Sequence, residues 1–298
     1  MSNKSPTALS PEEVVAAALN EQGFLLHHKV LNVLQDAARS DQWQDTWDIE
    51  AFEMSVSLPN HDETRIDLIL RHKKPERPWW VVVECKRASP DYKRWVFFAQ
   101  NQLGRGPSPN RYYIERARMV GEWTEALQPE PPMSHGIEPK SAVPACPVYD
   151  FGIEARLNVP SNAKRVSATD SIEDACRQVT LGQAGLSLKL RTAHELIINL
   201  IPVVVTTADL QSADFDVDHV SLSRGEIDAK DLKLSPRKWL GVNYRASDVI
   251  SQYSRFTTLK KQTVAEHLTS WQVRTVFVVQ AEHILEFFTW LENHFPSS

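Results

Sequence analysis

Charged residues follow directly on an apolar run in the stretch WWVVVECK, residues 79–86. A continuous apolar run of this length predicts a strand covered on both faces, as the central strands of a sheet are. Alternate residues of a strand point to the same face, so Glu84 and Lys86 share one face and Cys85 occupies the other. A carboxylate and an ammonium group therefore emerge together where the strand leaves the core.

A second carboxylate lies in the preceding apolar stretch, RIDLIL at residues 65–70, which we also predict to be a strand. If the two strands pair, Asp67 comes close to Glu84. Two neighbouring carboxylates repel each other unless a cation lies between them. Carboxylate oxygens suit Mg²⁺ or Mn²⁺, which keep several waters and accept a substrate phosphate as a further ligand. We therefore expect Asp67 and Glu84 to bind one of these cations.

A divalent cation beside a lysine is suited to phosphodiester hydrolysis. The cation polarises a phosphoryl oxygen and lowers the pKa of a bound water. Lys86 can orient or deprotonate that water, or neutralise the charge that develops on the phosphate. Asp67, Glu84 and Lys86 are therefore the predicted catalytic residues.

The elements that would position these residues alternate between helices and strands. Apolar residues at helical spacing follow a helix start at Ser10-Pro11, and the later segments show strand or helix patterns in turn. The predicted helices cover residues 11–34, 89–102, about 169–198 and 283–295, and the predicted strands cover 52–58, 65–70, 79–86, 200–210 and 274–280, with one or two more near 112–120 and 148–159. This order predicts an α/β protein built on one mixed sheet.

The spacing and order of these residues resemble the PD-(D/E)xK nuclease superfamily, which has the restriction-endonuclease-like fold. The matching pattern is Asp67, sixteen intervening residues and Glu84-Cys85-Lys86, within a helix–strand–strand–strand–helix order. It covers residues 12–102, and residues 170–210 would continue the core. The resemblance implies a mixed central sheet flanked by helices and metal-dependent cleavage of nucleic acid, more often DNA than RNA. It also implies that Asp67 and Glu84 are the metal ligands and that Lys86 positions the water.

The resemblance implies auxiliary residues as well. Many such nucleases carry a glutamate in the first helix that assists the metal site, and Glu21 is the candidate for it here. His27 stands where several relatives have that acid. Some members use a glutamine on the helix after the motif, for which Gln100 and Gln102 are candidates. Ile66 replaces the proline of the family's name, at a position that varies.

Basic residues are concentrated around the motif although the whole chain is acidic. The formal net charge is −5, yet residues 65–118 hold thirteen Lys or Arg and five Asp or Glu. Neutralising phosphates requires cations, so this segment is the predicted nucleic-acid-binding face. The resemblance to the nuclease superfamily implies DNA as the favoured partner. The residues expected to contact the strand are Lys73, Lys74, Arg87, Lys93 and Arg94.

The composition is that of a globular protein in a reducing compartment. The 298 residues are 42% apolar and 24% charged, which allows a sizeable core. The three cysteines, Cys85, Cys146 and Cys176, are widely spaced, which argues against a disulfide framework and a structural zinc site. No apolar run approaches the ~18 residues of a membrane span, and the first residues lack the plan of a signal peptide. We therefore expect a cytoplasmic protein with no membrane partner.

We expect a single nuclease domain over residues 1–298. Its core would comprise residues 12–102 and 170–210, with an insertion at about 104–168 and a C-terminal extension at about 211–298. By analogy with the superfamily, its role would lie in microbial restriction, phage defence or DNA repair.

Three alternatives use the same residues differently. A non-catalytic nucleic-acid-binding or scaffold protein would keep the fold and the motif without cleaving. A partner-activated nuclease would be silent until an activating protein or ligand binds; the partner could also be a second copy of the chain in a homodimer. A thiol-dependent hydrolase would use Cys85 with His27, although the alternation of the strand places Cys85 on the packed face, where a small core residue is expected.

Overall fold

The computed structural model describes residues 10–21, 24–40, 43, 45–58, 63–74, 79–98, 112–118, 133–137, 146–156, 170–190, 197–245 and 273–295. Within them the helices are α1 (Pro11–Glu21), α2 (Phe24–Arg39), α3 (Asp170–Leu190) and α6 (Ile284–His294). The strands are β1 (Trp47–Val56), β2 (Thr64–His72), β3 (Trp79–Lys86), β4 (Arg94–Phe98), β5 (Tyr112–Arg118), β6 (Met133–Ile137), β7 (Val148–Tyr149), β8 (Phe151–Ala155), β9 (Ile197–Thr206), β10 (Asp209–Asp214), β11 (Lys233–Pro236), β12 (Trp239–Arg245) and β13 (Val273–Gln280). None of the helices in these residues is both long and apolar enough to cross a membrane.

The central sheet has nine strands and is mixed. Its main path runs β1-β2-β3-β9-β13-β12-β7, and β5 pairs with both β9 and β6 beside this path. β1, β2 and β3 are antiparallel neighbours, whereas β3, β9 and β13 run parallel. The structure therefore confirms an α/β protein with a mixed central sheet.

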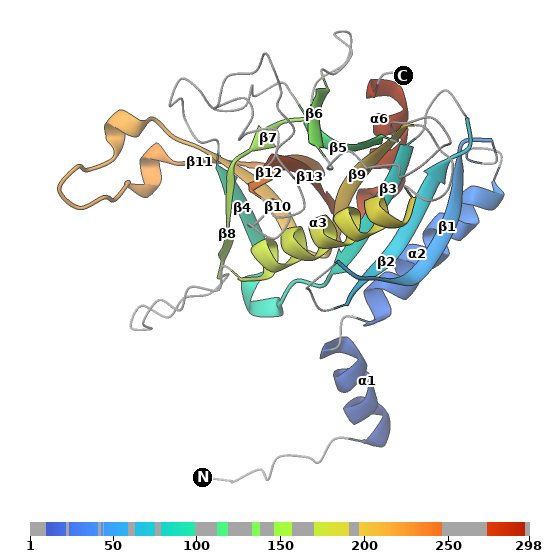
Figure 1. Cartoon of the computed structure of the whole chain (residues 1–298). Helices are drawn as coiled ribbons and strands as arrows, with labels where there is room; N and C mark the ends of the chain where they lie inside the picture. The colour runs from blue at the N-terminus through green and yellow to red at the C-terminus, as the bar shows by residue number, and fades with distance from the viewer. Residues whose placement is uncertain are drawn as a thin grey trace, which may run out of the picture.

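Helices cover both faces of this sheet (Figure 1). α3 packs against β2, β3 and β9 over a core that contains Ile66 and Val82. α2 and α6 cover the other face, where Leu34, Phe277 and Phe288 are fully buried. α1 extends away from the sheet with its described side chains exposed. Because helices cover β3 from both sides, its first five residues are all buried, as its apolar run predicts.

The helix predicted over residues 89–102 is wrong, because part of this segment is a strand of a smaller sheet with the order β11-β10-β4-β8. That segment forms a single 3-10 turn (Pro90–Tyr92) and then β4, while residues 99–102 lie outside the described part of the chain. β4 pairs parallel with β10 and antiparallel with β8. Its sequence, RWVFF, is aromatic and β-branched, which favours a strand once neighbours on both sides cover it.

Other element boundaries also differ from the sequence prediction. The segment predicted as one helix over residues 11–34 forms α1 and α2, and the strand predicted over residues 200–210 is divided between β9 and β10. The helix expected over residues 169–198 ends at Leu190, and Ile197 and Ile198 already belong to β9, where they pair with β5. The strand expected at residues 52–58 begins earlier, at Trp47, because β1 pairs with the whole length of β2. In the last two cases tertiary pairing extends a strand beyond its local pattern.

Segments expected as an insertion and an extension also contribute strands. β5 lies within residues 104–168 and pairs with β9. β12 and β13 lie within residues 211–298 and stand between β9 and β7 in the central sheet. The central sheet therefore draws on the chain well beyond the predicted core ranges.

α3 lies close to the sheet because two of its residues lack a side chain. A Cβ at Gly182 would lie 2.8 Å from Cγ1 of Ile66, and a Cβ at Gly185 would lie 2.8 Å from Cβ of Val56. Gln183 then donates a 2.8 Å hydrogen bond from Nε2 to a backbone carbonyl of β9. These contacts fix the height and rotation of α3 over β2 and β3.

Candidate active site

β2 and β3 bring Asp67 and Glu84 to neighbouring strands. Leu68 pairs with Val83, so the next position of the antiparallel register sets Asp67 opposite Glu84. The backbone N–H of Cys85 donates a 2.7 Å hydrogen bond to Oδ2 of Asp67. The strand pairing expected from the sequence is present, and this bond ties the Asp67 carboxylate to the end of β3.

A third carboxylate, Glu53 of β1, continues the row. The pairs that flank it in the β1–β2 register are Phe52 with Leu68 and Met54 with Ile66. Glu53 therefore stands opposite Asp67. Its backbone has a φ of 49°, in the left-handed region that residues other than glycine rarely adopt.

The β1–β2 hairpin loses its regular alternation of side chains at Glu53 and Asp67. The Phe52 pair packs on the side of α2, whereas the Met54 pair, two residues further along, packs on the side of α3. A regular strand returns to the same face after two residues. Glu53 and Asp67 thus lie where the apolar side chains of each strand switch from one core to the other, so both carboxylates stand at the boundary between the two cores.

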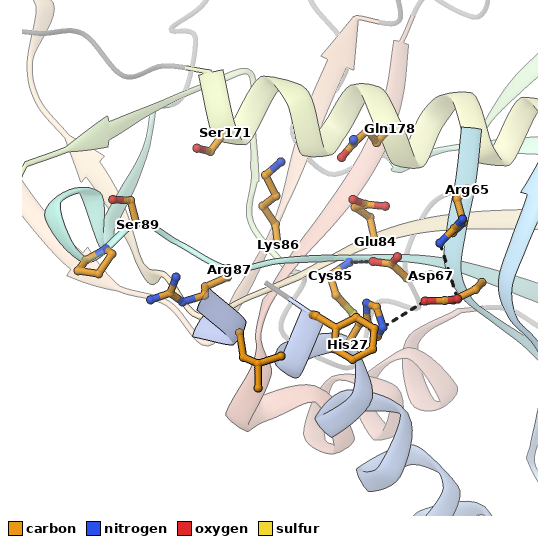
Figure 2. A pocket seen from close by; sticks show the side chains of 14 residues that line it. His27, Arg65, Asp67, Glu84, Cys85, Lys86, Arg87, Ser89, Ser171 and Gln178 are labelled. Atoms are coloured by element: carbon orange, nitrogen blue, oxygen red, sulfur yellow. Dashed lines mark hydrogen bonds and ion pairs between the residues drawn. The ribbon is translucent and has the colours of Figure 1, made fainter. Parts of the chain in front are cut away.

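Glu53 contacts two nitrogen-bearing side chains. Nε2 of His27 lies 3.4 Å from its Oε1, and Nη1 of Arg65 lies 3.7 Å from its Oε2. Figure 2 shows His27 on the side of the strands opposite to Lys86. Partly exposed ion pairs contribute only about 0–1 kcal/mol to stability, so these contacts mainly orient the groups around Asp67.

Burial raises the pKa of both central carboxyls, and nearby carboxylates add to the shift, Glu53 at Asp67 and Asp67 at Glu84. Loss of water raises the pKa of Asp67, and its bond from Cys85 and the nearby His27 offset this only in part. Burial, and then Asp67, raise the pKa of Glu84 to about 8, although Lys86 opposes the shift. Ionisation of both carboxyls is therefore disfavoured at neutral pH. A cation bound between them would lower both pKa values and favour the ionised forms.

Lys86 is held by a residue that the sequence analysis did not identify. Its Nζ donates a 2.8 Å hydrogen bond to Oδ2 of Asp174 on α3, and Nη2 of Arg177 lies 2.7 Å from Oδ1 of the same carboxylate. Burial tends to raise the pKa of Asp174, but the bonds from Lys86 and Arg177 outweigh it and lower the pKa. Asp174 is therefore an ionised partner that fixes the Lys86 ammonium beneath α3.

A cavity of about 890 Å³ joins these groups at the ends of β2 and β3 (Figure 2). Glu84 and Lys86 point toward α3, whereas His27 approaches from α2. The cavity therefore has walls from both layers of helices. Its lining residues are Leu19, Phe24, His27, Glu53, Arg65, Asp67, Glu84, Cys85, Lys86, Arg87, Ser89, Pro90, Ser171 and Gln178.

Asp67 and Glu84 fit a divalent cation by their chemistry. Both are oxygen ligands in one cavity, and burial makes their double ionisation unfavourable without a counter-charge. Mg²⁺ is commonly held by one or two carboxylates and completes its shell with waters and phosphate. Among the described residues, no group of three or more His, Cys, Asp or Glu side chains is arranged to hold a metal ion. Two carboxylates in one cavity match the pattern of few protein ligands that Mg²⁺ commonly has.

Cys85 is poorly suited to nucleophilic catalysis. Burial raises its pKa well above the ordinary value for a thiol, and the nearby Asp67 and Glu84 raise it further. The thiolate, which is the reactive form, is therefore strongly disfavoured. This electrostatic setting argues against a thiol-dependent hydrolase using Cys85 and His27.

The predicted strand-contacting residues are distributed over different parts of the molecule. Arg87 lines the cavity. Lys73 and Lys74 follow the opposite end of β2, where Nζ of Lys73 lies 3.2 Å from Oδ1 of Asp48. Lys93 and Arg94 stand at the start of β4 in the smaller sheet. The structure thus brings one of these five residues to the carboxylates.

The auxiliary candidates also differ in position. His27 lines the cavity. Glu21 ends α1, and its side chain lies outside the described part of the structure, as do residues Gln100 and Gln102. A different glutamine, Gln178 of α3, lines the cavity.

The α3 residues at the site share one helix face. Ser171, Asp174 and Gln178 are spaced by three and four positions, so they project from neighbouring turns. That spacing is visible in the sequence, but only the packing of α3 over β3 shows that this helix face lies at the cavity. Glu53 carried a weaker signal, a charged residue flanked by apolar ones in a predicted strand.

The chain was compared with protein-family models, curated proteins and solved structures, and none of these comparisons gave a match.

Proposed function

We propose that the protein is a metal-dependent nuclease that hydrolyses phosphodiester bonds, with DNA as the favoured substrate. The observation that carries this proposal is the convergence of Asp67, Glu84 and Lys86 on one cavity, with the pKa of both carboxyls raised. Arg65 and Arg87 line the same cavity, and guanidinium groups bind phosphate oxygens well. The sequence resemblance to the PD-(D/E)xK nucleases supports the same assignment.

Each side chain has a defined task in this proposal. Asp67 and Glu84 would hold Mg²⁺ or Mn²⁺, which when bound supplies charge neutralisation and lowers the pKa of a water. Lys86, on the same strand face as Glu84, would orient the attacking water or neutralise the developing phosphate charge. Asp174 would hold the Lys86 ammonium in place through the 2.8 Å hydrogen bond.

Cleavage by the wild type and by Lys86→Ala tests the proposal. Supercoiled plasmid, linear duplex, single-stranded DNA and RNA would each be incubated with Mg²⁺, Mn²⁺ or EDTA. We expect metal-dependent cutting by the wild type and a rate lower by about 10²–10⁴-fold in the variant, as for loss of an acid–base group. Cys85→Ala is the control, because a metal nuclease retains its activity in this variant and a thiol-dependent hydrolase does not.

The outcomes separate the alternatives. Full activity of Lys86→Ala would remove that residue from the mechanism. Absence of cutting, with Mn²⁺ bound by the wild type but not by Asp67→Asn in calorimetry, would favour a partner-activated nuclease. Absence of both cutting and metal binding would favour a non-catalytic scaffold.

The partner-activated nuclease is the second candidate because of the Lys86–Asp174 pair. The Lys86 ammonium already has an ionised partner at 2.8 Å, and that partner also contacts Arg177. A protein or ligand that moved α3 would release the ammonium toward Glu84. Activity that appears only with an added partner would support this candidate.

A further inference from the structure

Phe24 is an aromatic residue at a cavity that is otherwise rich in charge. It begins α2, lines the cavity and is 45% exposed. Its ring meets His27 and His28 at centroid distances of 5.0 Å and 4.2 Å, with interplanar angles of 66° and 62°. Both contacts are edge-to-face, so neither histidine is stacked on the phenyl ring. Nearly half of the Phe24 residue nevertheless remains exposed, and burying exposed aromatic surface against a flat partner is favourable.

Apolar and charged groups occupy different walls of the same cavity. Leu19 and Pro90 line it together with Phe24, while Arg65 and Lys86 bring positive charge beside the carboxylates. One segment of nucleic acid has the matching two parts, an anionic phosphate and a flat apolar base. The volume of about 890 Å³ is at the upper end of the range for pockets that enclose small ligands.

We propose that Phe24 stacks on an unpaired base of the substrate strand while the adjoining phosphate lies at Asp67, Glu84 and Lys86. This inference rests on the proposed nuclease function and names its substrate class. In a duplex, both faces of each base are covered by neighbouring base pairs, so the ring could not reach them. The site therefore takes single-stranded segments, such as ends, flaps and gaps, in preference to continuous duplex. Stacking on an aromatic side chain is tolerant of base identity, so little sequence preference is expected at this position.

Leu25 provides a matched control for this proposal. It is the next residue of α2, is 46% exposed, and does not line the cavity. Loss of a similar exposed apolar side chain there changes the helix surface without changing the cavity. A general apolar contact of the helix with nucleic acid would depend on both residues, whereas base stacking depends on Phe24 alone.

Binding would be measured by fluorescence anisotropy with Mg²⁺, using the full chain carrying Lys86→Met so that substrates stay intact. The variants in this background are Phe24→Ala, Phe24→Tyr and Leu25→Ala. The ligands are a labelled single-stranded oligothymidine, a duplex closed at both ends by abasic linkers, and a strand of equal length made of abasic units. Thermal melting of each variant verifies that it is folded.

We expect Phe24→Ala to weaken binding of oligothymidine by about 5- to 150-fold, the range for loss of one base–aromatic stack. Phe24→Tyr and Leu25→Ala should bind within about twofold of the parent. The abasic strand should bind equally to all variants, because it offers no base to stack. The duplex should bind more weakly than the strand, with no dependence on Phe24.

Failure of the stacking proposal can be distinguished from failure of the nuclease proposal. Equal binding of oligothymidine by Phe24→Ala and the parent, with cleavage by the wild type intact, would overturn only the stacking. An equal loss for oligothymidine, abasic strand and duplex would assign Phe24 to a structural role and also overturn it. If the parent bound no nucleic acid and the wild type cut none, both proposals would fall together.

Discussion

Two pairs of a cation and a carboxylate involve strands of the central sheet, and they differ in their exposure to solvent. Lys86 and Asp174 meet at 2.8 Å beside the cavity, with side chains 27% and 33% exposed. Arg274 of β13 and Glu115 of β5 meet at 3.6 Å with no exposure at all. Burial lowers the pKa of Arg274, and the charge of Glu115 raises it again. The deep pair thus balances charge inside a closed core.

The cavity differs because its lysine, Lys86, is held by Asp174 and not by the two central carboxyls. Asp174 is ionised against Lys86, yet the pKa values of Asp67 and Glu84 remain raised, chiefly by burial. Burial of charge alone is therefore a poor guide to function. Carboxyls whose pKa stays raised at an open cavity are the better sign of a ligand site.

Breaking the deep pair should have the largest effect on stability. Arg274→Met takes a buried counter-charge away from Glu115, a change that typically destabilises a protein by about 3–5 kcal/mol. Urea unfolding at pH 7 would measure this loss. The double variant with Glu115→Leu should recover most of it, because two apolar side chains remove both charges together. A loss under about 1 kcal/mol for Arg274→Met alone would contradict the contrast drawn above.

Breaking the cavity pair should instead lower activity. In Asp174→Asn the Lys86 ammonium loses its ionised partner and becomes free to pair with Glu84. We expect the cleavage rate constant to fall about tenfold, near the lower limit for a hydrogen bond to a charged group. Stability should change by less than about 1 kcal/mol, as for other partly exposed pairs.

Arg177→Gln is the matched control for Asp174→Asn. It removes the second partner of Asp174 and keeps the bond to Lys86. Steady-state kinetics should show a fall in kcat with little change in KM for Asp174→Asn, and a near-normal rate for Arg177→Gln. Asp174→Glu should restore part of the activity. Equal losses in both variants would show that the helix surface, and not the lysine contact, is what matters.

The last prediction concerns Glu84 itself. The pKa of Glu84 is about 8 in the folded chain, against an ordinary value of 4.5. The folded state therefore keeps a proton that the unfolded state releases, and stability is lost as the pH rises from about 4.5 to about 8. Glu84→Gln removes this loss, so in EDTA its Tm should exceed that of the wild type by several degrees at pH 8, because each tenfold change in an acid dissociation constant corresponds to about 1.4 kcal/mol.

Thermal melting at pH 5 and pH 8 checks this sign. The difference between Glu84→Gln and the wild type should be much smaller at pH 5, close to the ordinary pKa of 4.5, than at pH 8. Added Mg²⁺ should stabilise the wild type more than the variant, because binding to the folded state raises its stability. An equal Tm difference at both pH values would mean that Glu84 does not titrate in this range.

Local pattern was enough to predict part of this site. β3 has the bounds given by its apolar run, and alternation along the strand put Glu84 and Lys86 on one face. Asp67 reached Glu84 because consecutive strands paired as antiparallel neighbours. These features depend on residues close together in the chain, where sequence periodicity carries information.

The remaining features depend on distant contacts. Asp174 lies 88 positions from Lys86, and only the docking of α3 joins them. The helix expected after Ser89 became β4 because β8 and β10 cover the segment from both sides. No local pattern encodes such neighbours.

The change of face in the β1–β2 hairpin has a consequence for how the site relates to the rest of the fold. If Glu53 and Asp67 were removed together, the Phe52 pair would adjoin the Met54 pair, and the alternation of both strands would still send each pair to its present side. The hydrophobic pattern of the two strands therefore does not require Glu53 and Asp67. A hairpin shorter by one residue in each strand would fill both hydrophobic cores equally well. Glu53 and Asp67, which interrupt the regular alternation of the two strands, therefore belong to the cavity and not to the packing of the cores.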